Sequence, residues 1–286
     1  MKKTLFSLFT IIFTIITIIS LTSCGKYDYV IAVPNDTTNE ARALQLLENQ
    51  GIIKLAEGAG ITATVSDIVE NPYNVKIEEV EAAQLPRVLD SVDFAVINSN
   101  YAIAGGLNPI EEALAFEGSS SAYSNILACK AGNENTPKIQ ALKVALESKA
   151  VADFITSTYN GAVVSVVSNP DEDGYSDSID YASLNGTKIT VAASATPHAE
   201  VLEIVKTILA AKGITLDIKV YDDYVQPNLV VDSGELDANY FQHVPYLDDF
   251  NAENKTNVVS VAAIHVEPLG IYGGKLNSLD VFKNLV

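Results

Sequence analysis

An internal repeat is the feature that most constrains the fold of this chain. Residues 76–86 align with residues 217–227, and each stretch is followed by a matching segment, 92–95 in the first copy and 236–239 in the second. Each copy has the pattern of a strand, a helix and a second strand. Two such βαβ units predict two similar α/β lobes. Because ligands of open α/β sheets bind beyond the carboxyl ends of the strands, facing lobes would enclose a cleft that closes about a hinge.

Strands and helices alternate along most of the chain. An apolar run predicts a strand at 29–33, and further strands are predicted at 75–80, 92–98, 125–130, 188–192 and 216–221. Helical periodicity predicts helices at 38–49, 82–89 and 137–159. Gly51 is expected just after the first of these helices. Thr196 is expected to cap a further helix, with Pro197 at its first position and its end at Gly213.

One segment departs from this alternation. Residues 165–186 are rich in Asp, Ser and Tyr and have no sustained apolar period, which predicts a linker. We therefore expect lobe one to comprise 27–122 with 272–286, lobe two to comprise 123–164 with 187–271, and an acidic linker at 165–186.

The first 23 residues have the pattern of an export signal. Lys2 and Lys3 precede an uncharged apolar run at 5–21, and the small residues before Cys24 suit a signal peptidase. By length alone this run also fits a retained membrane helix or a plain secretory signal. A cysteine directly after the cut is the lipid acceptor of bacterial lipoproteins. It favours a protein anchored to the cell membrane through Cys24, facing the periplasm or the extracellular side.

Charge and cysteine content narrow the class of partner. The formal net charge of −18 argues against nucleic acid and against anionic lipid surfaces. Cys129 has no intramolecular partner once Cys24 carries lipid, so neither a disulfide framework nor a cysteine-rich metal site is expected. Because Cys129 ends an apolar run, we expect a buried, inert thiol.

The usual enzyme signatures are missing from the sequence. It contains no G-x-S-x-G, no phosphate loop and no dinucleotide fingerprint, and its acids are scattered rather than paired. The close sequence spacing of metal ligands is also missing from the three histidines, His198, His243 and His265, even when Glu200 and Glu267 are counted with them. We therefore expect a binding protein rather than an enzyme, with no cofactor and no resident metal.

Candidate binding residues follow the predicted strands. Thr37 and Glu40 have capping-box spacing at the start of the first helix, whose free N–H groups would face the cleft. Arg42 lies two positions further on, where its guanidinium either grips a carboxylate or lies on a solvated helix surface.

Aromatic and amide side chains follow equivalent strands of the two lobes. Candidates after the 236–239 segment are Tyr240, Phe241, Gln242 and His243, with Tyr224 upstream; those after the 92–98 strand are Asn98, Asn100 and Tyr101. Rings with a few fixed polar groups are the usual lining of a small-molecule site, although any single ring also fits core packing.

Several stretches resemble the NlpA family, the methionine-binding lipoproteins that serve ABC importers. The most specific is ELDANYFQHVPYL at 235–247. The others are TPHAE at 196–200, YVQPN at 224–228, HVEPLG at 265–270, PND at 34–36 with NE at 39–40 and RAL at 42–44, EAAQLPR at 81–87 and AVIN at 95–98.

The order of these stretches differs from that of the family. In the family, the part that resembles 187–282 comes first and the part that resembles 29–164 follows. The resemblance therefore implies a type II periplasmic-binding-protein fold in circularly permuted order, cut just after 275–279, with 165–186 bridging the old ends. Domain termini often lie close together, so such a permutation is tolerated. A domain-swapped dimer is a further possibility.

The resemblance also implies a function and a set of ligand contacts. The protein would capture L-methionine, another apolar amino acid or a short methionine peptide, and deliver it to an ABC permease and its ATPase. Arg42 would bind the α-carboxylate with Asn39 beside it, and Asn98 and Asn125 would hold the polar end. The side chain would lie against Tyr224, Tyr240, Phe241 and His243. Two other functions stay open: a metal-ion importer subunit, and a surface adhesin lipoprotein.

Overall fold

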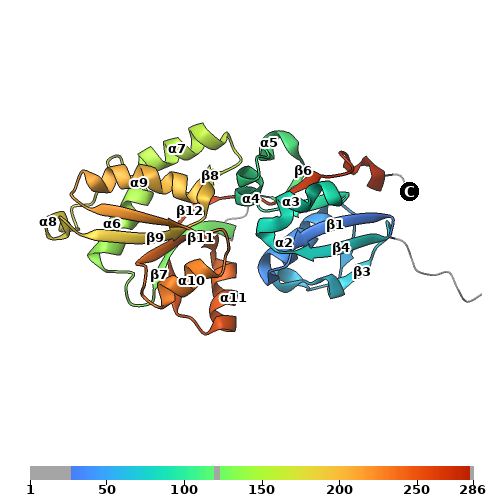
Figure 1. Cartoon of the computed structure of the whole chain (residues 1–286), viewed down its shortest axis with the longest axis horizontal. Helices are drawn as coiled ribbons and strands as arrows, with labels where there is room; N and C mark the ends of the chain where they lie inside the picture. The colour runs from blue at the N-terminus through green and yellow to red at the C-terminus, as the bar shows by residue number, and fades with distance from the viewer. Residues whose placement is uncertain (1–26, 119–122, 284–286) are drawn as a thin grey trace, which may run out of the picture.

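The computed structural model describes residues 27–118 and 123–283. These residues form two α/β lobes that lie side by side (Figure 1). The predicted signal segment and Cys24 lie outside the described residues. Within the described ranges, none of the helices combines the length and the apolar character that crossing a bilayer requires. The α/β class and the two-lobed form predicted from the repeat are confirmed.

Lobe one is built on a five-stranded sheet with the order β4-β1-β5-β13-β6. Its strands are β1 (Tyr29–Pro34), β4 (Val75–Val80), β5 (Phe94–Ile97), β6 (Ala113–Phe116) and β13 (Gly270–Gly273); β2 (Lys54–Leu55) and β3 (Ile68–Glu70) pair separately. The helices are α2 (Thr37–Asn49), α3 (Leu85–Val88), α4 (Ser99–Ala104) and α5 (Pro109–Glu112). β1 is buried on both faces, which explains its unbroken apolar run.

Lobe two has a six-stranded sheet with the order β10-β9-β11-β7-β12-β8. Its strands are β7 (Ser124–Lys130), β8 (Val164–Ser165), β9 (Lys188–Ala193), β10 (Thr215–Val220), β11 (Ala238–His243) and β12 (Val258–Val266). Its helices are α6 (Pro137–Leu146), α7 (Lys149–Tyr159), α8 (Tyr181–Leu184), α9 (Glu200–Ala210), α10 (Gln226–Asp232) and α11 (Val244–Asn254). Cys129 is fully buried in the core of this lobe, as expected.

The internal repeat is visible in the strand order. β4-β1-β5 in lobe one and β10-β9-β11 in lobe two are parallel triplets with the same connectivity. In each triplet, an aspartate just before the third strand accepts a hydrogen bond from a backbone N–H of the middle strand. Asp93 Oδ2 accepts from the Val30 N–H at 2.8 Å, and Asp237 Oδ2 accepts from the Thr190 N–H at 2.8 Å. The likeness between the two stretches therefore reflects equivalent structure.

Three predicted helices differ from the structure. The helix predicted at 137–159 is two helices, because Ser148 is extended and its Oγ caps α7 by accepting from the Val151 N–H. The helix predicted at 82–89 breaks into short turns around Pro86. Thr196 does not cap a helix: it is extended, a single π turn covers Ala195–Ala199, and α9 begins only at Glu200.

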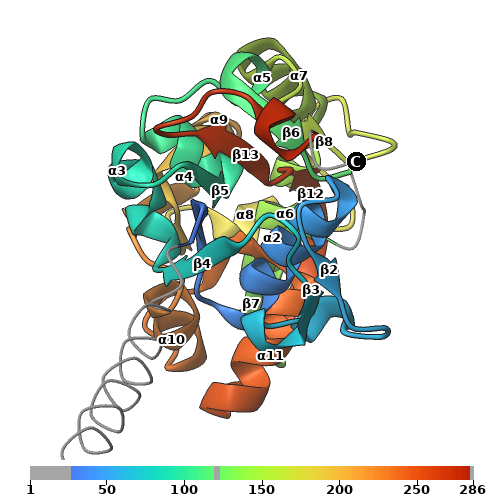
Figure 2. The same cartoon turned by 90° about the vertical axis from the view of Figure 1, so that its right-hand side faces the viewer.

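The chain passes from lobe one to lobe two between β6 and β7 and returns to lobe one through residues 267–269. After the second crossing, β13 lies between β5 and β6, so it returns to the lobe-one sheet (Figure 2). It begins at Gly270, two residues before the expected boundary at 272. The last described turn, Leu279–Phe282, packs its Phe282 ring into the lobe-one core.

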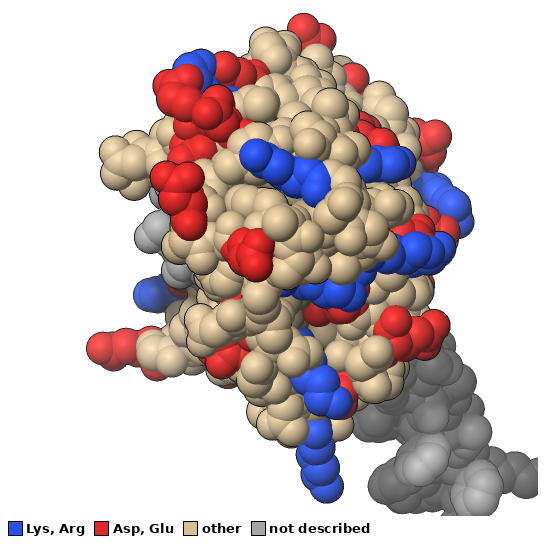
Figure 3. Space-filling view, turned by 90° about the vertical axis from the view of Figure 1, so that its left-hand side faces the viewer, with Lys and Arg blue, Asp and Glu red and all other residues tan. Residues whose placement is uncertain are grey.

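The segment 165–186 is packed against lobe two rather than extended into solvent. The Asp171 N–H donates to the Glu147 carbonyl at 3.1 Å, and the Tyr175 hydroxyl donates to the Ile208 carbonyl at 2.6 Å. At this end of the molecule, Lys and Arg side chains lie among Asp and Glu side chains (Figure 3).

Candidate functional site

A cavity lies between the two lobes, with an empty volume of about 350 Å³. Lobe one contributes Asn39, Arg42, Asn98, Ser99 and Asn100; lobe two contributes Asn125, Tyr224, Phe241, Gln242, His243 and Tyr246; and Glu267 comes from the second crossing. The lining is polar on the lobe-one side and aromatic on the lobe-two side.

The N-terminus of α2 places two of the lobe-one residues. Asp36 caps this helix, because its Oδ1 accepts from the Asn39 N–H at 3.1 Å and from the Asn39 side chain at 2.9 Å. The capping box predicted for Thr37 and Glu40 is wrong. Glu40 turns away and accepts from the Val65 N–H at 3.0 Å. Capping by Asp36 fixes Asn39 at the opening of the helix and Arg42 one turn further on.

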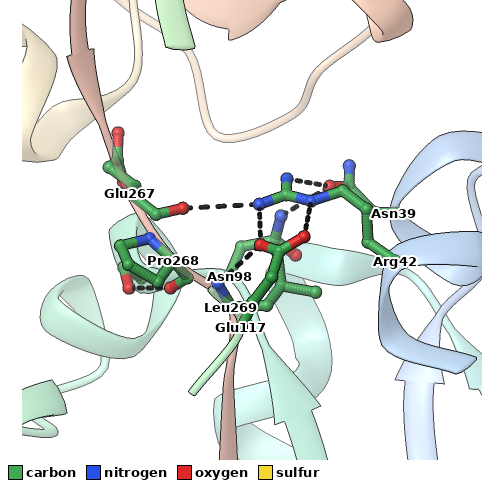
Figure 4. A network of polar contacts seen from close by, with 8 residues as sticks. Asn39, Arg42, Asn98, Glu117, Glu267, Pro268 and Leu269 are labelled. Atoms are coloured by element: carbon green, nitrogen blue, oxygen red, sulfur yellow. Dashed lines mark hydrogen bonds and ion pairs between the residues drawn. The ribbon is translucent and has the colours of Figure 1, made fainter. Parts of the chain in front are cut away.

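Arg42 is buried, with 3 % of its surface exposed, so it is not a surface arginine. Its guanidinium makes a bidentate ion pair with Glu117, from Nε to Oε1 at 3.0 Å and from Nη2 to Oε2 at 2.5 Å (Figure 4). Nη1 donates to Asn39 Oδ1 at 3.0 Å, and Nη2 lies 3.4 Å from the Glu267 carbonyl. Among the described residues, Asn39 is the only acceptor of Nη1, and the guanidinium carbon lies 4.4 Å from the ring centroid of Tyr123.

Asn98 is joined to the same network. Its Nδ2 donates to Asn39 Oδ1 at 2.9 Å. Its Oδ1 is buried and has no hydrogen-bond partner among the described residues. A buried acceptor without a donor is costly, so this oxygen indicates where a ligand N–H or O–H would bind.

The aromatic side of the cavity is a cluster of rings. The ring centroid of Tyr224 lies 5.7 Å from that of Phe241 and 5.8 Å from that of Tyr246. His243 begins α11, where its Nδ1 accepts from the Tyr246 N–H at 3.1 Å. Burial holds the pKa of His243 well below its usual range, so the ring is neutral. The described lobe-two residues of the lining are therefore uncharged, and their rings lie beside the amides of Asn125 and Gln242.

Two of the aromatic candidates, Tyr101 and Tyr240, do not line the cavity. The Tyr101 hydroxyl donates instead to the Asp222 carbonyl at 3.0 Å. Tyr240 is fully buried in the core of lobe two, where its hydroxyl lies 2.5 Å from His265 Nδ1. A β-bulge against β7 interrupts β11 between Tyr240 and Gln242. The bulge breaks strict alternation, so Phe241, Gln242 and His243 all reach the cavity.

Behind the cavity, folding brings together a histidine–glutamate cluster. Glu267 Oε1 lies 2.7 Å from His265 Nε2 and 3.2 Å from His198 Nε2. His198 Nε2 is also 2.9 Å from Asn125 Oδ1, which connects the cluster to the cavity lining. The ligand atoms of the two histidines and Glu267 lie within 4.8 Å of one another, so the cluster could hold a divalent metal ion.

The cluster predicts a loss of stability in acid. Burial lowers the pKa values of His198 and His265 to about 3, against 6.5 in the unfolded chain. The stabilisation present above pH 6.5 is therefore lost as the pH falls towards 3. At 1.36 kcal/mol per unit, each histidine lowers the free energy of unfolding by about 2 kcal/mol between pH 6.5 and 5. Burial raises the pKa of Glu267, which offsets part of this loss.

Urea denaturation at pH 7 and pH 5 measures this effect. We expect the difference in unfolding free energy between the two pH values to shrink in His198→Gln. A difference as large in the variant as in the wild type would contradict the assignment.

Four important residues were not among the candidate site residues. Ser99 and Tyr246 line the cavity as neighbours of candidate residues, so their position beside strand ends was a usable signal. Glu117 and Glu267 are two of 36 acids in the chain, and nothing in their local sequence marks them as partners of Arg42.

The sequence of this chain is similar to those of several known proteins. The sequence matches the model of the NlpA lipoprotein family over residues 17–167 and 189–284. The membrane lipoprotein TpN32 of Treponema pallidum is 50% identical over 135 residues, which cover 47% of this chain and 50% of that protein. The D-methionine-binding lipoprotein MetQ of Escherichia coli K12 is 41% identical over 136 residues, which cover 47% of this chain and 50% of that protein.

A solved structure shows a similar partial match. The nutrient-binding protein from Burkholderia cenocepacia bound to methionine is 48% identical, with a TM-score of 0.47, and the match covers 48% of this chain and 58% of that one. The chain spans about half the length of the curated relatives it matches.

Proposed function

Because this chain belongs to the NlpA lipoprotein family, we propose that it is a solute-binding protein of an ABC importer. Its ligand would be L-methionine, another apolar amino acid or a short methionine-containing peptide. Binding rather than catalysis fits the site, since a closed cleft needs only differential affinity to capture its ligand.

The division of the cavity into two sides is the observation that carries this proposal. Arg42 and the asparagine amides of lobe one meet the charged backbone end of an amino acid. The rings of Tyr224, Phe241 and Tyr246 receive its side chain, and sulfur–aromatic contacts favour a thioether there. A relative that shares about half its length with this chain is named a D-methionine-binding lipoprotein, which supports the same ligand class.

The partners and location belong to the same proposal. We propose that Cys24 carries the lipid anchor, that the protein is held at the cell membrane on the extracellular or periplasmic side, and that it delivers ligand to a permease and its ATPase. The name of the family and the residues around Cys24 support the anchor.

We also propose that the two halves stand in circularly permuted order. The family match falls into two blocks that leave out residues 168–188, and the curated relatives align over only about half of their own length. Both facts are expected of a permuted chain, because an alignment that keeps the order of residues can match only one of the two exchanged halves at a time. The packed segment 165–186 would be the new connection.

Thermal unfolding with and without L-methionine tests the proposed function. At a ligand concentration of 100 times Kd, a specific ligand adds about 2.7 kcal/mol, which raises Tm by a few degrees. The protein should first be unfolded and refolded, so that ligand carried through purification is removed.

Leucine, glutamine and zinc serve as controls in the same assay. A rise in Tm with methionine and none with glutamine is the expected result. A rise with zinc alone would favour the metal-importer alternative, and no rise with any ligand would contradict the proposal.

A further inference from the structure

Helix α4 belongs to lobe one but packs against lobe two. It lies at the junction of the lobes (Figure 1), where it contacts the π turn at Ala195–Ala199. Its own end of the contact is fixed, because the Ser99 hydroxyl donates to the Pro268 carbonyl and Gly105 packs closely on Pro86. The helix is therefore a firm part of lobe one that reaches the other lobe directly.

Two reciprocal hydrogen bonds join α4 to the segment between β10 and α10 of lobe two. The Tyr101 hydroxyl donates to the Asp222 carbonyl at 3.0 Å, and the Tyr224 hydroxyl donates to Asn100 Oδ1 at 2.8 Å. The rings of the two tyrosines also lie against each other, with their centroids 4.9 Å apart. A hinge movement that separates the lobes breaks all three contacts, because each joins one lobe to the other.

A further contact of α4 is apolar. Ile103 is half-buried and packs against the hydrophobic core of lobe two, although it belongs to lobe one. Removing this apolar surface from water favours the arrangement in which the lobes meet. We call these five residues the α4 clasp: Asn100, Tyr101 and Ile103 from lobe one, with Asp222 and Tyr224 from lobe two.

Only part of the α4 clasp reaches the cavity. Asn100 and Tyr224 line it, whereas Tyr101 and Ile103 do not. Changes at Tyr101 and Ile103 can therefore weaken the contact between the lobes without removing a group that lines the cavity. Because the Tyr101 ring lies against Tyr224, it also fixes the position of one ring of the aromatic wall.

We propose that Tyr101 is a positioning residue that, together with Ile103, holds the lobes closed over the ligand and so sets the rate at which the ligand leaves. This inference rests on the proposed function, and it assigns a role to residues outside the cavity lining. The clasp contacts exist only in the closed form, so they oppose opening but take no part in the first encounter with the ligand. They are therefore expected to act on the dissociation rate constant koff and to leave the association rate constant kon almost unchanged.

Stopped-flow measurement of L-methionine binding and release tests the proposal, with tyrosine fluorescence as the signal because the chain has 13 tyrosines and no tryptophan. Tyr101→Phe keeps the ring and removes only the hydroxyl, and it is expected to raise koff about 5-fold, the size of one ordinary hydrogen bond. Ile103→Ala tests the apolar contact independently and is expected to raise koff about 10-fold. In both variants kon should stay within about 2-fold of the wild-type value.

Tyr175→Phe is the matched control for Tyr101→Phe. The Tyr175 hydroxyl also donates to a backbone carbonyl, that of Ile208 at 2.6 Å, but this contact joins the 165–186 segment to lobe two and does not link the two lobes. The control variant should keep the wild-type koff. The two variants should change the Tm of the ligand-free protein by similar amounts, because each loses one tyrosine hydroxyl that donates to a backbone carbonyl.

The rate constants separate this inference from the proposed function. If wild-type protein binds L-methionine but koff stays within about 2-fold of its value in both clasp variants, the clasp is wrong and the proposed function stands. A fall in kon with an unchanged koff would also overturn the clasp, because it would mean that Tyr101 only shapes the cavity. An equal rise of koff in Tyr175→Phe would assign the effect to general stability instead. If wild-type protein binds none of the proposed ligands, the proposed function itself fails and this inference fails with it.

Discussion

Arg42→Met is expected to abolish measurable binding of L-methionine and to lower the free energy of unfolding by about 3 kcal/mol. Binding is lost because the substitution removes the only guanidinium among the described residues that line the cavity. Stability is lost because Glu117, whose side chain is 15% exposed, keeps its charge but loses its partner. Titration calorimetry measures the first effect and urea denaturation the second.

The double variant Arg42→Met/Glu117→Gln separates the two effects. With the carboxylate neutralised, we expect most of the lost stability to return while binding stays absent. Binding restored in the double variant would show that Arg42 only balances Glu117. Normal affinity in the single variant would contradict the carboxylate assignment outright.

Phe282→Ala is expected to cost about 3–5 kcal/mol of stability, although it lies only a few residues from the end of the chain. The ring is 5% exposed, and its centroid lies 5.0 Å from that of Tyr29, 5.1 Å from that of Tyr73 and 5.5 Å from that of Phe94. Deleting it opens a cavity in the lobe-one core. Urea denaturation measures the loss.

Phe116→Ala is the matched control, because it removes the same side chain from a position that is 36% exposed. We expect it to cost less than about 1 kcal/mol. A large effect of Phe282→Ala would support assigning the C-terminal segment to lobe one, as the expected domain division does. Equal small effects of the two variants would show that this segment is dispensable for the lobe.

Much of the fold could be predicted because its signals are local. The apolar runs in β1 and β9 identify strands by themselves, and a comparison of residues 76–86 with 217–227 reveals the repeat. The predicted helix at 137–159 was too long because both of its parts are amphipathic, and only the extended backbone at Ser148 separates them. The helix cap predicted at Thr196 was wrong for a similar reason, because a capping residue followed by proline also fits an extended turn.

The site was harder to predict because its decisive contacts join distant residues. Arg42 meets Glu117 at a separation of 75 residues and the Glu267 carbonyl at 225. Asn98 and Phe241 were found from their place at the ends of predicted strands, and Asn39 came only from the family resemblance. The bulge in β11 that turns Tyr240 away from the cavity leaves no mark in the sequence. The balance of charges in the cavity can be worked out only when the contacts of Arg42 with these distant residues are known.

Arg42 lies beside both chain crossings, about which the lobes would turn. Arg42 contacts Glu117 in one crossing and the Glu267 carbonyl in the other, and the Leu269 N–H links the second crossing to Glu117 Oε2 at 3.3 Å. Points near a rotation axis move least, so opening should displace the aromatic wall of lobe two far more than the guanidinium. We therefore expect a departing ligand to free its side chain first and to remain tethered by its charged end until last.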